Sequence, residues 1–232
     1  MNMRLHKTKI HLSFLVLMIL ALGSPVFATD ANKLPKNYSP EFIQSKIEIT
    51  GRSFFDYLRR LGISEKDVLA ARGQKWLSVG EGNSDFTKEA NSRGVDSWAL
   101  DAVVKNPHVP EKSVIGLAQK LPFPDNSFDR VVSVWLIDHF FNTQGFNDPA
   151  AGKLAILEMI RVAKLGADIR INPINQSSLL SILDELKAKQ IISYDVLPFF
   201  SGAFRLEGKK RFFELQPVKD EAPGSVRIVR LK

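Results

Sequence analysis

Short apolar runs of strand length alternate with longer amphipathic segments through most of this chain, and this alternation limits the possible folds most strongly. The strand-like runs lie at residues 75–79, 97–100, 113–117, 128–135 and 167–171. The segments with helical spacing of apolar residues lie at residues 86–93, 150–163 and 177–190. A short helix is also expected at residues 64–71, where Ser64 and Asp67 approximate a capping box. Strands that alternate with helices favour a mostly parallel sheet with helices on both faces, and right-handed crossovers make such a sheet doubly wound. We therefore predict an α/β, Rossmann-like fold.

The C-terminal region follows a different pattern. Three strand-like runs, at residues 191–197, 211–218 and 225–231, have no long helix between them. The segment 220–224 (DEAPG) predicts a turn. We therefore expect the sheet to end in an antiparallel C-terminal edge hairpin that two of these three runs form.

The N-terminal 28 residues have the order of a secretory signal peptide. Basic residues precede an apolar run of 11 residues, 12–22, and Ala28 ends a small-residue cleavage pattern. The run is shorter than the roughly 20 residues that a membrane-spanning helix needs, although an uncleaved anchor and a buried helix are alternative interpretations. We expect residues 1–28 to be a signal peptide, 29–39 a flexible leader and 40–232 one folded domain. The domain would then be exported to a bacterial periplasm or secreted, without a stable membrane span.

The composition fits a globular monomer without covalent cross-links. Hydrophobic residues make up 44% of the chain and charged residues 25%, and cysteine is absent, which excludes disulfides and cysteine-type zinc sites. Beyond residue 28 the only histidines are His108 and His139, so we expect no metal site. Removal of residues 1–28 lowers the net charge from +7 to +4. The basic run at residues 209–211 is short and is interpreted as a solvated turn, so we predict no nucleic-acid-binding surface.

A strand, a glycine turn and a helix follow one another at residues 75–93. Gly80 and Gly82 lie in the turn, where the absence of a Cβ lets a ligand approach the backbone closely. Asp101 comes 21 residues after Gly80, at the end of the second strand, where a carboxylate can accept hydrogen bonds from ribose hydroxyls. The third glycine of the dinucleotide fingerprint is absent, because Asp85 stands in its place. The pattern therefore predicts a ribose-binding site at this turn.

Later motifs resemble those of a known family in sequence and in order. Residues 121–129 (LPFPDNSFD) nearly repeat a run of the class I S-adenosylmethionine-dependent methyltransferases, in particular their type 11, ubiquinone-biosynthesis-like domain. Residues 131–140 resemble the strand that follows this run, and residues 158–167 resemble the family's E-x-x-R-V-L-K-P-G-G motif. The resemblance implies a Rossmann-like fold, S-adenosylmethionine as cofactor, and methyl transfer to an unidentified acceptor, which is a small molecule, a lipid or a protein.

The resemblance also implies which residues bind the cofactor. Gly80 and Gly82 match the family's glycine turn, and Asp101 matches its ribose-binding acid. The backbone N–H of Ala118 is expected at the adenine ring. Trp135, at the end of the fourth strand, is expected to face the ligand or else to be a core residue.

Three positions depart from the family pattern. Ser78 replaces an acid before the glycine turn, Ser84 replaces a glycine, and Leu117 stands where many members place an acid for the adenine amino group. Glu81 could replace the missing acid by meeting the cofactor's ammonium group, or it is an exposed turn residue. These departures and the expected export support an alternative, a catalytically inactive binding or scaffold protein of the cell envelope.

Two of the family-like motifs also have a purely structural interpretation. Residues 121–129 would form a loop that enters a strand, with Phe128 in the core and Asp129 at a turn or cap. Glu158 and Arg161 are three residues apart on a predicted helix, which is the spacing of an exposed ion pair.

Methyl transfer chiefly needs alignment of the reacting atoms, and a base only where the nucleophile must lose a proton. Asp138 and His139, at the end of the fourth strand, are the candidate catalytic residues, because an unperturbed imidazole titrates near neutrality. A structural or merely lining role for His139 is the alternative. An open, polar-lined cleft over Gly80 and Asp101 would favour an enzyme. A scaffold would be favoured by a cleft filled with large aromatic side chains, namely Phe86, Trp98 or Trp135.

Overall fold

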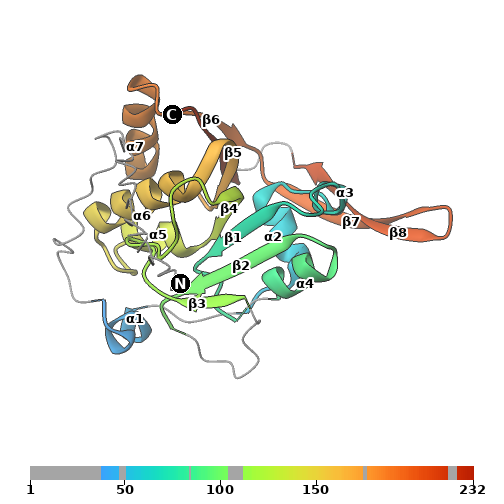
Figure 1. Cartoon of the computed structure of the whole chain (residues 1–232), viewed down its shortest axis with the longest axis horizontal. Helices are drawn as coiled ribbons and strands as arrows, with labels where there is room; N and C mark the ends of the chain where they lie inside the picture. Colours follow the sequence, from blue (N-terminus) through green and yellow to red (C-terminus); the bar gives the residue numbers. More distant parts are fainter. Residues whose placement is uncertain (1–37, 47–50, 84, 104–111, 175–176, 219–223) are drawn as a thin grey trace, which may run out of the picture.

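The computed structural model describes residues 38–46, 51–83, 85–103, 112–174, 177–218 and 224–232. The predicted signal peptide, most of the predicted leader, Ser84 and His108 lie outside these residues. Figure 1 shows a layered α/β body from which a long two-stranded ribbon extends on one side.

A mostly parallel sheet forms the centre of this body. Seven described strands are arranged in the order β3-β2-β1-β4-β5-β9-β6, and β9 is antiparallel to both of its neighbours. In sheet order, the strands are β3 (Ser113–Ile115), β2 (Asp96–Asp101), β1 (Lys75–Val79), β4 (Phe128–Val134), β5 (Ala163–Asn172), β9 (Ser225–Arg230) and β6 (Ile192–Leu197). The strand order reverses between β1 and β4, which is where open α/β sheets bind ligands. The predicted doubly wound, Rossmann-like fold is confirmed.

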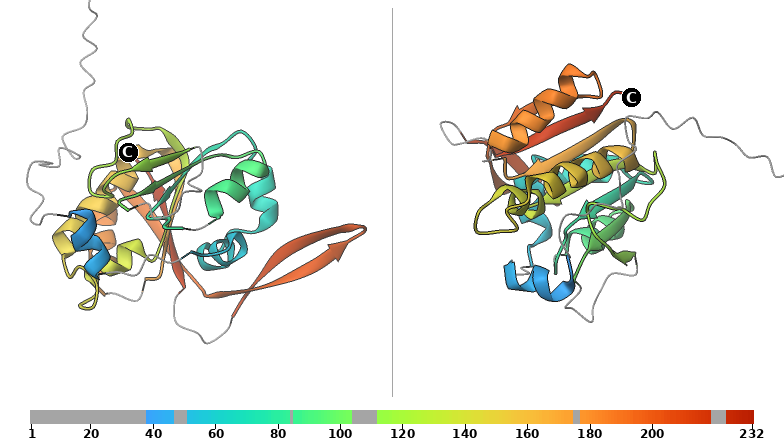
Figure 2. Two further views of the ribbon diagram at one scale, coloured as in Figure 1. Left: turned by 90° about the horizontal axis from the view of Figure 1, so that it is seen from below. Right: turned by 90° about the vertical axis from the view of Figure 1, so that its left-hand side faces the viewer.

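The C-terminal edge is antiparallel, as the sequence predicts. The two runs that pair there are β6 and β9. The third run becomes β8 (Lys210–Pro217), which leaves the sheet and pairs with β7 (Phe200–Glu207), a strand that the sequence did not reveal. The edge pair is therefore joined by a separate ribbon rather than by a tight turn, and Figure 2 shows this ribbon extending away from the body.

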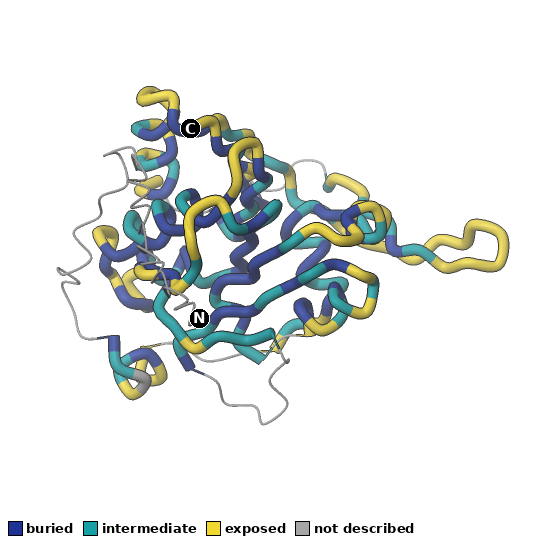
Figure 3. The backbone as a smooth tube through the Cα atoms, viewed as in Figure 1, coloured by how far each residue is buried: buried dark blue, intermediate teal, exposed yellow. Residues whose placement is uncertain are grey.

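Helices cover both faces of the sheet. They are α1 (Pro40–Lys46), α2 (Phe54–Leu61), α3 (Glu65–Ala70), α4 (Phe86–Ser92), α5 (Leu136–Phe141), α6 (Pro149–Val162) and α7 (Ser177–Ala188). Side chains alternate along β1, so Leu77 and Val79 join the core under α5, α6 and α7, whereas Trp76 joins the core under α2, α3 and α4. Figure 3 shows the central strands buried between these layers.

Local sequence signals explain the start of α3 but not that of α5. The predicted capping box of α3 is present, because Ser64 Oγ accepts from the Asp67 N–H at 3.1 Å and Asp67 Oδ2 accepts from the Ser64 N–H at 2.8 Å. Helix α5 was not predicted. It begins because Trp135 adopts a left-handed conformation, with φ of 71°, and turns the chain out of β4. Among the described residues, none of the helices combines the length and apolar character that crossing a bilayer requires.

Glu158 and Arg161 hold the loop that follows β3. Glu158 is only 5% exposed, and its carboxylate accepts from the Leu121 N–H at 2.8 Å and from two Arg161 nitrogens at 2.7 and 2.8 Å. Arg161 also donates to the carbonyl oxygens of Leu121 and Phe123. The interpretation of this pair as an exposed ion pair is therefore wrong, because helical spacing alone does not show what packs over a helix.

Candidate functional site

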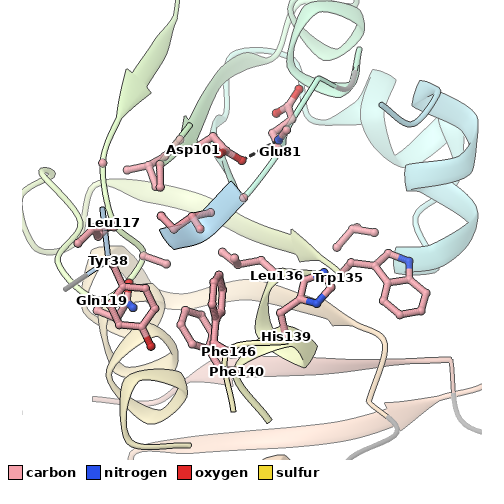
Figure 4. A pocket seen from close by; sticks show the side chains of 18 of the residues that line it. Tyr38, Glu81, Asp101, Leu117, Gln119, Trp135, Leu136, His139, Phe140 and Phe146 are labelled. Carbon is pink, nitrogen blue, oxygen red and sulfur yellow. Dashed lines mark hydrogen bonds between the residues drawn. The ribbon is translucent and has the colours of Figure 1, made fainter. Parts of the chain in front are cut away.

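A cavity of about 290 Å³ lies at the carboxyl ends of β1, β2 and β4. Figure 4 shows the side chains around it, with Asp101 on one side and the aromatic rings of Tyr38, Phe140 and Phe146 on the other. Its volume is close to the lower end of the roughly 300–1,000 Å³ that is typical of small-molecule sites.

The glycine turn forms one wall of the cavity. Gly80 and Gly82 both have positive φ, 72° and 63°. A Cβ on Gly80 would lie 2.6 Å from the Cβ of Leu136, so a side chain there would collide with the start of α5. Glycine is required at Gly80 both for the backbone conformation and for this close approach.

Asp101 connects the glycine turn to the end of β2. Its Oδ2 accepts from the Gly82 N–H at 2.8 Å and its Oδ1 from the Val103 N–H at 2.9 Å. Burial raises the pKa of Asp101, and these backbone donors oppose that rise. Each oxygen keeps acceptor capacity, since a carboxylate oxygen can take two hydrogen bonds. The predicted ribose-binding acid is therefore held in place at the cavity.

Glu81 reaches the cavity only with its backbone. Its carboxylate accepts from the Thr87 N–H at 2.9 Å and from Thr87 Oγ1 at 2.5 Å, and the residue is 4% exposed. Figure 4 shows this side chain directed away from the cavity. The unpaired N–H groups at the start of α4 attract it. The structure therefore supports neither interpretation of Glu81. Its carboxylate does not face the cavity as a substitute for the missing acid, and the residue is not an exposed turn residue. Ser78 is fully buried, and its Oγ has no hydrogen-bond partner among the described residues.

The segment after β3 forms the wall next to Asp101. Leu117 and Ala118 line the cavity there, and Ala118 is 5% exposed. Gln119 also lines it, is 4% exposed, and its Nε2 has no hydrogen-bond partner within the described part of the chain. Gln119 was not predicted from the sequence, although its position two residues after Leu117, in the expected adenine wall, could have indicated it.

His139 faces the cavity from α5, but Asp138 does not. Burial lowers the pKa of His139, and nearby Arg52 lowers it further, while Asp138 has the opposite effect. The imidazole is therefore neutral near pH 7. Asp138 is 1% exposed, does not line the cavity, and has no hydrogen-bond partner for either carboxylate oxygen among the described residues. The structure therefore brings only one of the two predicted catalytic residues to the cavity.

The three large aromatic residues that could have filled the cleft do not fill it. Phe86 lies in the core under α4, where its ring stacks on Tyr57 at 4.8 Å between centroids. Trp98 packs edge-on against Phe123. Trp135 contributes to the cavity wall, but Figure 4 shows its indole directed away from the other labelled rings. The cleft over Gly80 and Asp101 is thus open.

The wall opposite Asp101 includes the N-terminal segment. Tyr38 is 7% exposed, and its ring packs edge-on against Phe140 and Phe146. Ile43 of α1 lines the same cavity. Tyr38 is therefore packed against the body, although it lies in the segment 29–39 that the sequence predicts as a flexible leader. One aromatic residue in a polar segment gave no sign of its distant partners.

A family model described as "Methyltransferase domain" matches residues 77–170. This match confirms the family resemblance over the segment that holds the glycine turn, Asp101 and the loop after β3. No curated protein gives a significant match.

Several solved structures are similar to this chain. The YcgJ protein from Bacillus subtilis has 14% sequence identity and a TM-score of 0.46, and the match covers 75% of this chain and 98% of that one. A TehB-like SAM-dependent methyltransferase from Corynebacterium glutamicum has 15% identity and a TM-score of 0.49, covering 75% and 86% of the two chains. A SAM-dependent methyltransferase from Methanosarcina mazei has 15% identity and a TM-score of 0.43, covering 68% and 93%.

Proposed function

Since residues 77–170 match the methyltransferase-domain family, we propose that this chain binds S-adenosylmethionine and transfers its methyl group to an acceptor. The observation that carries this proposal is the open cavity over Gly80 and Asp101, at the point where the strand order reverses. A buried carboxylate beside a cleft, with a pKa that burial raises, is a candidate functional group.

The described residues fit the nucleoside part of the cofactor. Asp101 would accept hydrogen bonds from the ribose hydroxyls, and the Ala118 N–H would meet the adenine ring. Leu117 would offer that ring an apolar contact in place of the family's acid. Gly82 carries no Cβ, which would let the cofactor approach the backbone of the turn closely.

When bound, S-adenosylmethionine supplies an electrophilic methyl group. The residues of the chain align the acceptor and keep water away from it, which is the main requirement of a displacement reaction. Phe140, Phe146 and Ile43 form the apolar wall that would hold the acceptor. His139 is neutral near pH 7 and would take a proton from the acceptor's nucleophilic atom onto its imidazole.

A binding or scaffold protein without activity is the second candidate, and specific observations favour it. The position of the family's first acid is Ser78, which is buried, and the carboxylate of neighbouring Glu81 is engaged with Thr87. Neither residue offers a carboxylate to an ammonium group in the cavity. Leu136 also lies directly against Gly80.

Isothermal titration with S-adenosylmethionine tests the proposal. The chain from Thr29 would be used, because it keeps every residue that the structure describes. We expect micromolar binding that Asp101→Asn weakens by at least about tenfold, since one charged acceptor is lost. Asp195→Asn, at an exposed carboxylate on β6, is the matched control and should bind as the wild type does. A folded protein that gives no heat at millimolar cofactor would contradict the proposal and favour the scaffold.

We propose in addition that the protein acts as an exported monomer. The order of basic, apolar and small residues in 1–28 supports export. N-terminal sequencing of the protein purified from the periplasm or medium should begin at Thr29. A protein with an intact Met1 in the cytoplasmic fraction would contradict export. A dimer in size-exclusion chromatography would contradict the monomeric state.

A further inference from the structure

The ribbon of β7 and β8 is a part of the molecule that the proposed chemistry does not use. It extends beyond the body in Figures 1 and 2. All residues of β7 after Phe200 are exposed, and Figure 3 shows the outer part of the ribbon as exposed on both strands. The outermost strand pair is Glu207 with Lys210, across the turn at Gly208.

The root of the ribbon is fixed to the body. Phe213 is 6% exposed and lies 4.9 Å from Phe55 of α2, between ring centroids. The Phe213 N–H donates to Glu65 Oε2 of α3 at 3.0 Å. Lys66 of α3 forms an ion pair with Glu207 near the tip. The ribbon is therefore presented in a defined direction.

The tip is cationic. Arg205, Lys209, Lys210 and Arg211 are all exposed. The two acids of the ribbon are already engaged, Glu207 with Lys66 and Glu214 with Arg205 at 2.9 Å. Among the described residues, Lys209, Lys210 and Arg211 form no ion pair, so their charge is available to an external anion.

The tip also exposes an aliphatic side chain. Leu206 is 75% exposed and lies opposite Arg211 in the strand register. Two aromatic rings nearby lie against cations, since the Arg211 guanidinium lies 4.0 Å from the Phe204 ring centroid and Lys66 Nζ lies 5.6 Å from that of Phe212, while Phe204 is itself 43% exposed. Leu206 is thus the most exposed apolar side chain of the tip, and it lies among basic residues.

We propose that the ribbon tip docks on an anionic lipid surface. Basic side chains near a bilayer are attracted to anionic headgroups, and an aliphatic side chain gains by entering the boundary with the acyl chains. Single-stranded nucleic acid fits this tip less well, because its recognition uses aromatic rings that stack on bases, and the two rings here already lie against cations. The docking would be reversible and would weaken in high salt.

Vesicle co-sedimentation tests this inference. The chain from Thr29 would be mixed with vesicles of phosphatidylcholine alone or of an equal mixture of phosphatidylcholine and phosphatidylglycerol. We expect binding only to the mixed vesicles, and a loss of at least about tenfold in the double variant Lys209→Glu/Lys210→Glu. Leu206→Ser should weaken binding by a similar factor at low and at high salt, because its contribution is not electrostatic.

Matched controls change similar residues on the body. Lys88→Glu/Lys120→Glu reverses two exposed lysines, and Leu165→Ser changes a leucine that is 63% exposed. Both controls should bind as the wild type does, and circular dichroism should show that all variants are folded. Equal binding to uncharged vesicles, no binding to either vesicle, or equal losses in controls and tip variants would overturn the inference. Binding of a single-stranded oligonucleotide in place of mixed vesicles would also overturn it.

Discussion

The phenolic oxygen of Tyr38 donates a hydrogen bond to Oδ2 of Asp148 at 3.0 Å, across 110 positions of sequence. The same carboxylate caps α6, because Asp148 Oδ1 accepts from the Ala151 N–H at 3.1 Å. Both Tyr38 and Asp148 are less than one-tenth exposed. One carboxylate therefore fixes the N-terminal wall of the cavity to the start of the helix behind it.

Replacement of Tyr38 by Phe should destabilise the protein measurably. Tyr38→Phe removes a hydrogen bond to a buried carboxylate, and we expect the free energy of unfolding to fall by about 1.5–3 kcal/mol in urea denaturation. Tyr194→Phe is the matched control, since Tyr194 donates to Asp184 on the exposed surface. Tyr194→Phe should lower the free energy of unfolding much less than Tyr38→Phe does. Equal losses in the two variants would show that the Tyr38 hydrogen bond gains nothing from burial.

A methyl group on Gly80 should cost more than backbone strain alone. Gly80→Ala forces a left-handed alanine and places its Cβ 2.6 Å from that of Leu136. Gly73→Ala has a similar φ of 78° but nothing within 4 Å of the new Cβ, so it isolates the strain. We expect Gly73→Ala to lower the free energy of unfolding by about 1–2 kcal/mol. Gly80→Ala should lose about 1–3 kcal/mol more through overpacking. Thermal or urea unfolding that ranks the two variants equally would contradict this steric role.

Loss of Glu158 should loosen the loop after β3. Glu158→Ala leaves the Leu121 N–H and the Arg161 guanidinium without their buried partner, and we expect a loss of about 3–5 kcal/mol in urea denaturation. Glu185→Ala is the control, because Glu185 makes comparable contacts to Lys153 and Lys189 on the exposed surface. It should change stability little. If hydrogen exchange at the Leu121 N–H stays slow in Glu158→Ala, Glu158 does not hold the loop after β3.

The strands and helices could be predicted where local pattern decides them. The strand at residues 75–79 and the helix start at Ser64 follow from apolar runs and capping chemistry, and the structure places both there. Helix α5 was missed because it depends on a left-handed Trp135, a conformation that is uncommon for a bulky residue and has no sequence signal. Strand β7 was missed because nearly all of its side chains are exposed, which removes the apolar periodicity of a packed strand.

The site was predictable only where it depends on sequence spacing. Gly80 and Asp101 follow from the position of a turn and of a strand end, and both line the cavity. Tyr38 could not be found in this way, since its partner lies 110 residues away. The side-chain direction of Glu81 was also not predictable. It depends on whether the hydrogen-bond donors of a ligand or the N–H groups at the start of α4 lie nearer to the carboxylate.

The stability of the protein should depend on the protonation of His139. Burial lowers the pKa of His139 below its ordinary 6.5, so the native protein binds this proton less readily than the unfolded chain does. As the pH falls below about 6.5, the unfolded state takes up the proton first, and the free energy of unfolding decreases until the lowered native pKa is reached. His139→Gln lacks this group. Urea denaturation at about pH 8 and about pH 5 should therefore show a larger loss for the wild type than for His139→Gln. Parallel losses in the two proteins would contradict a buried imidazole that stays neutral, and with it the supply of a neutral base at the cavity.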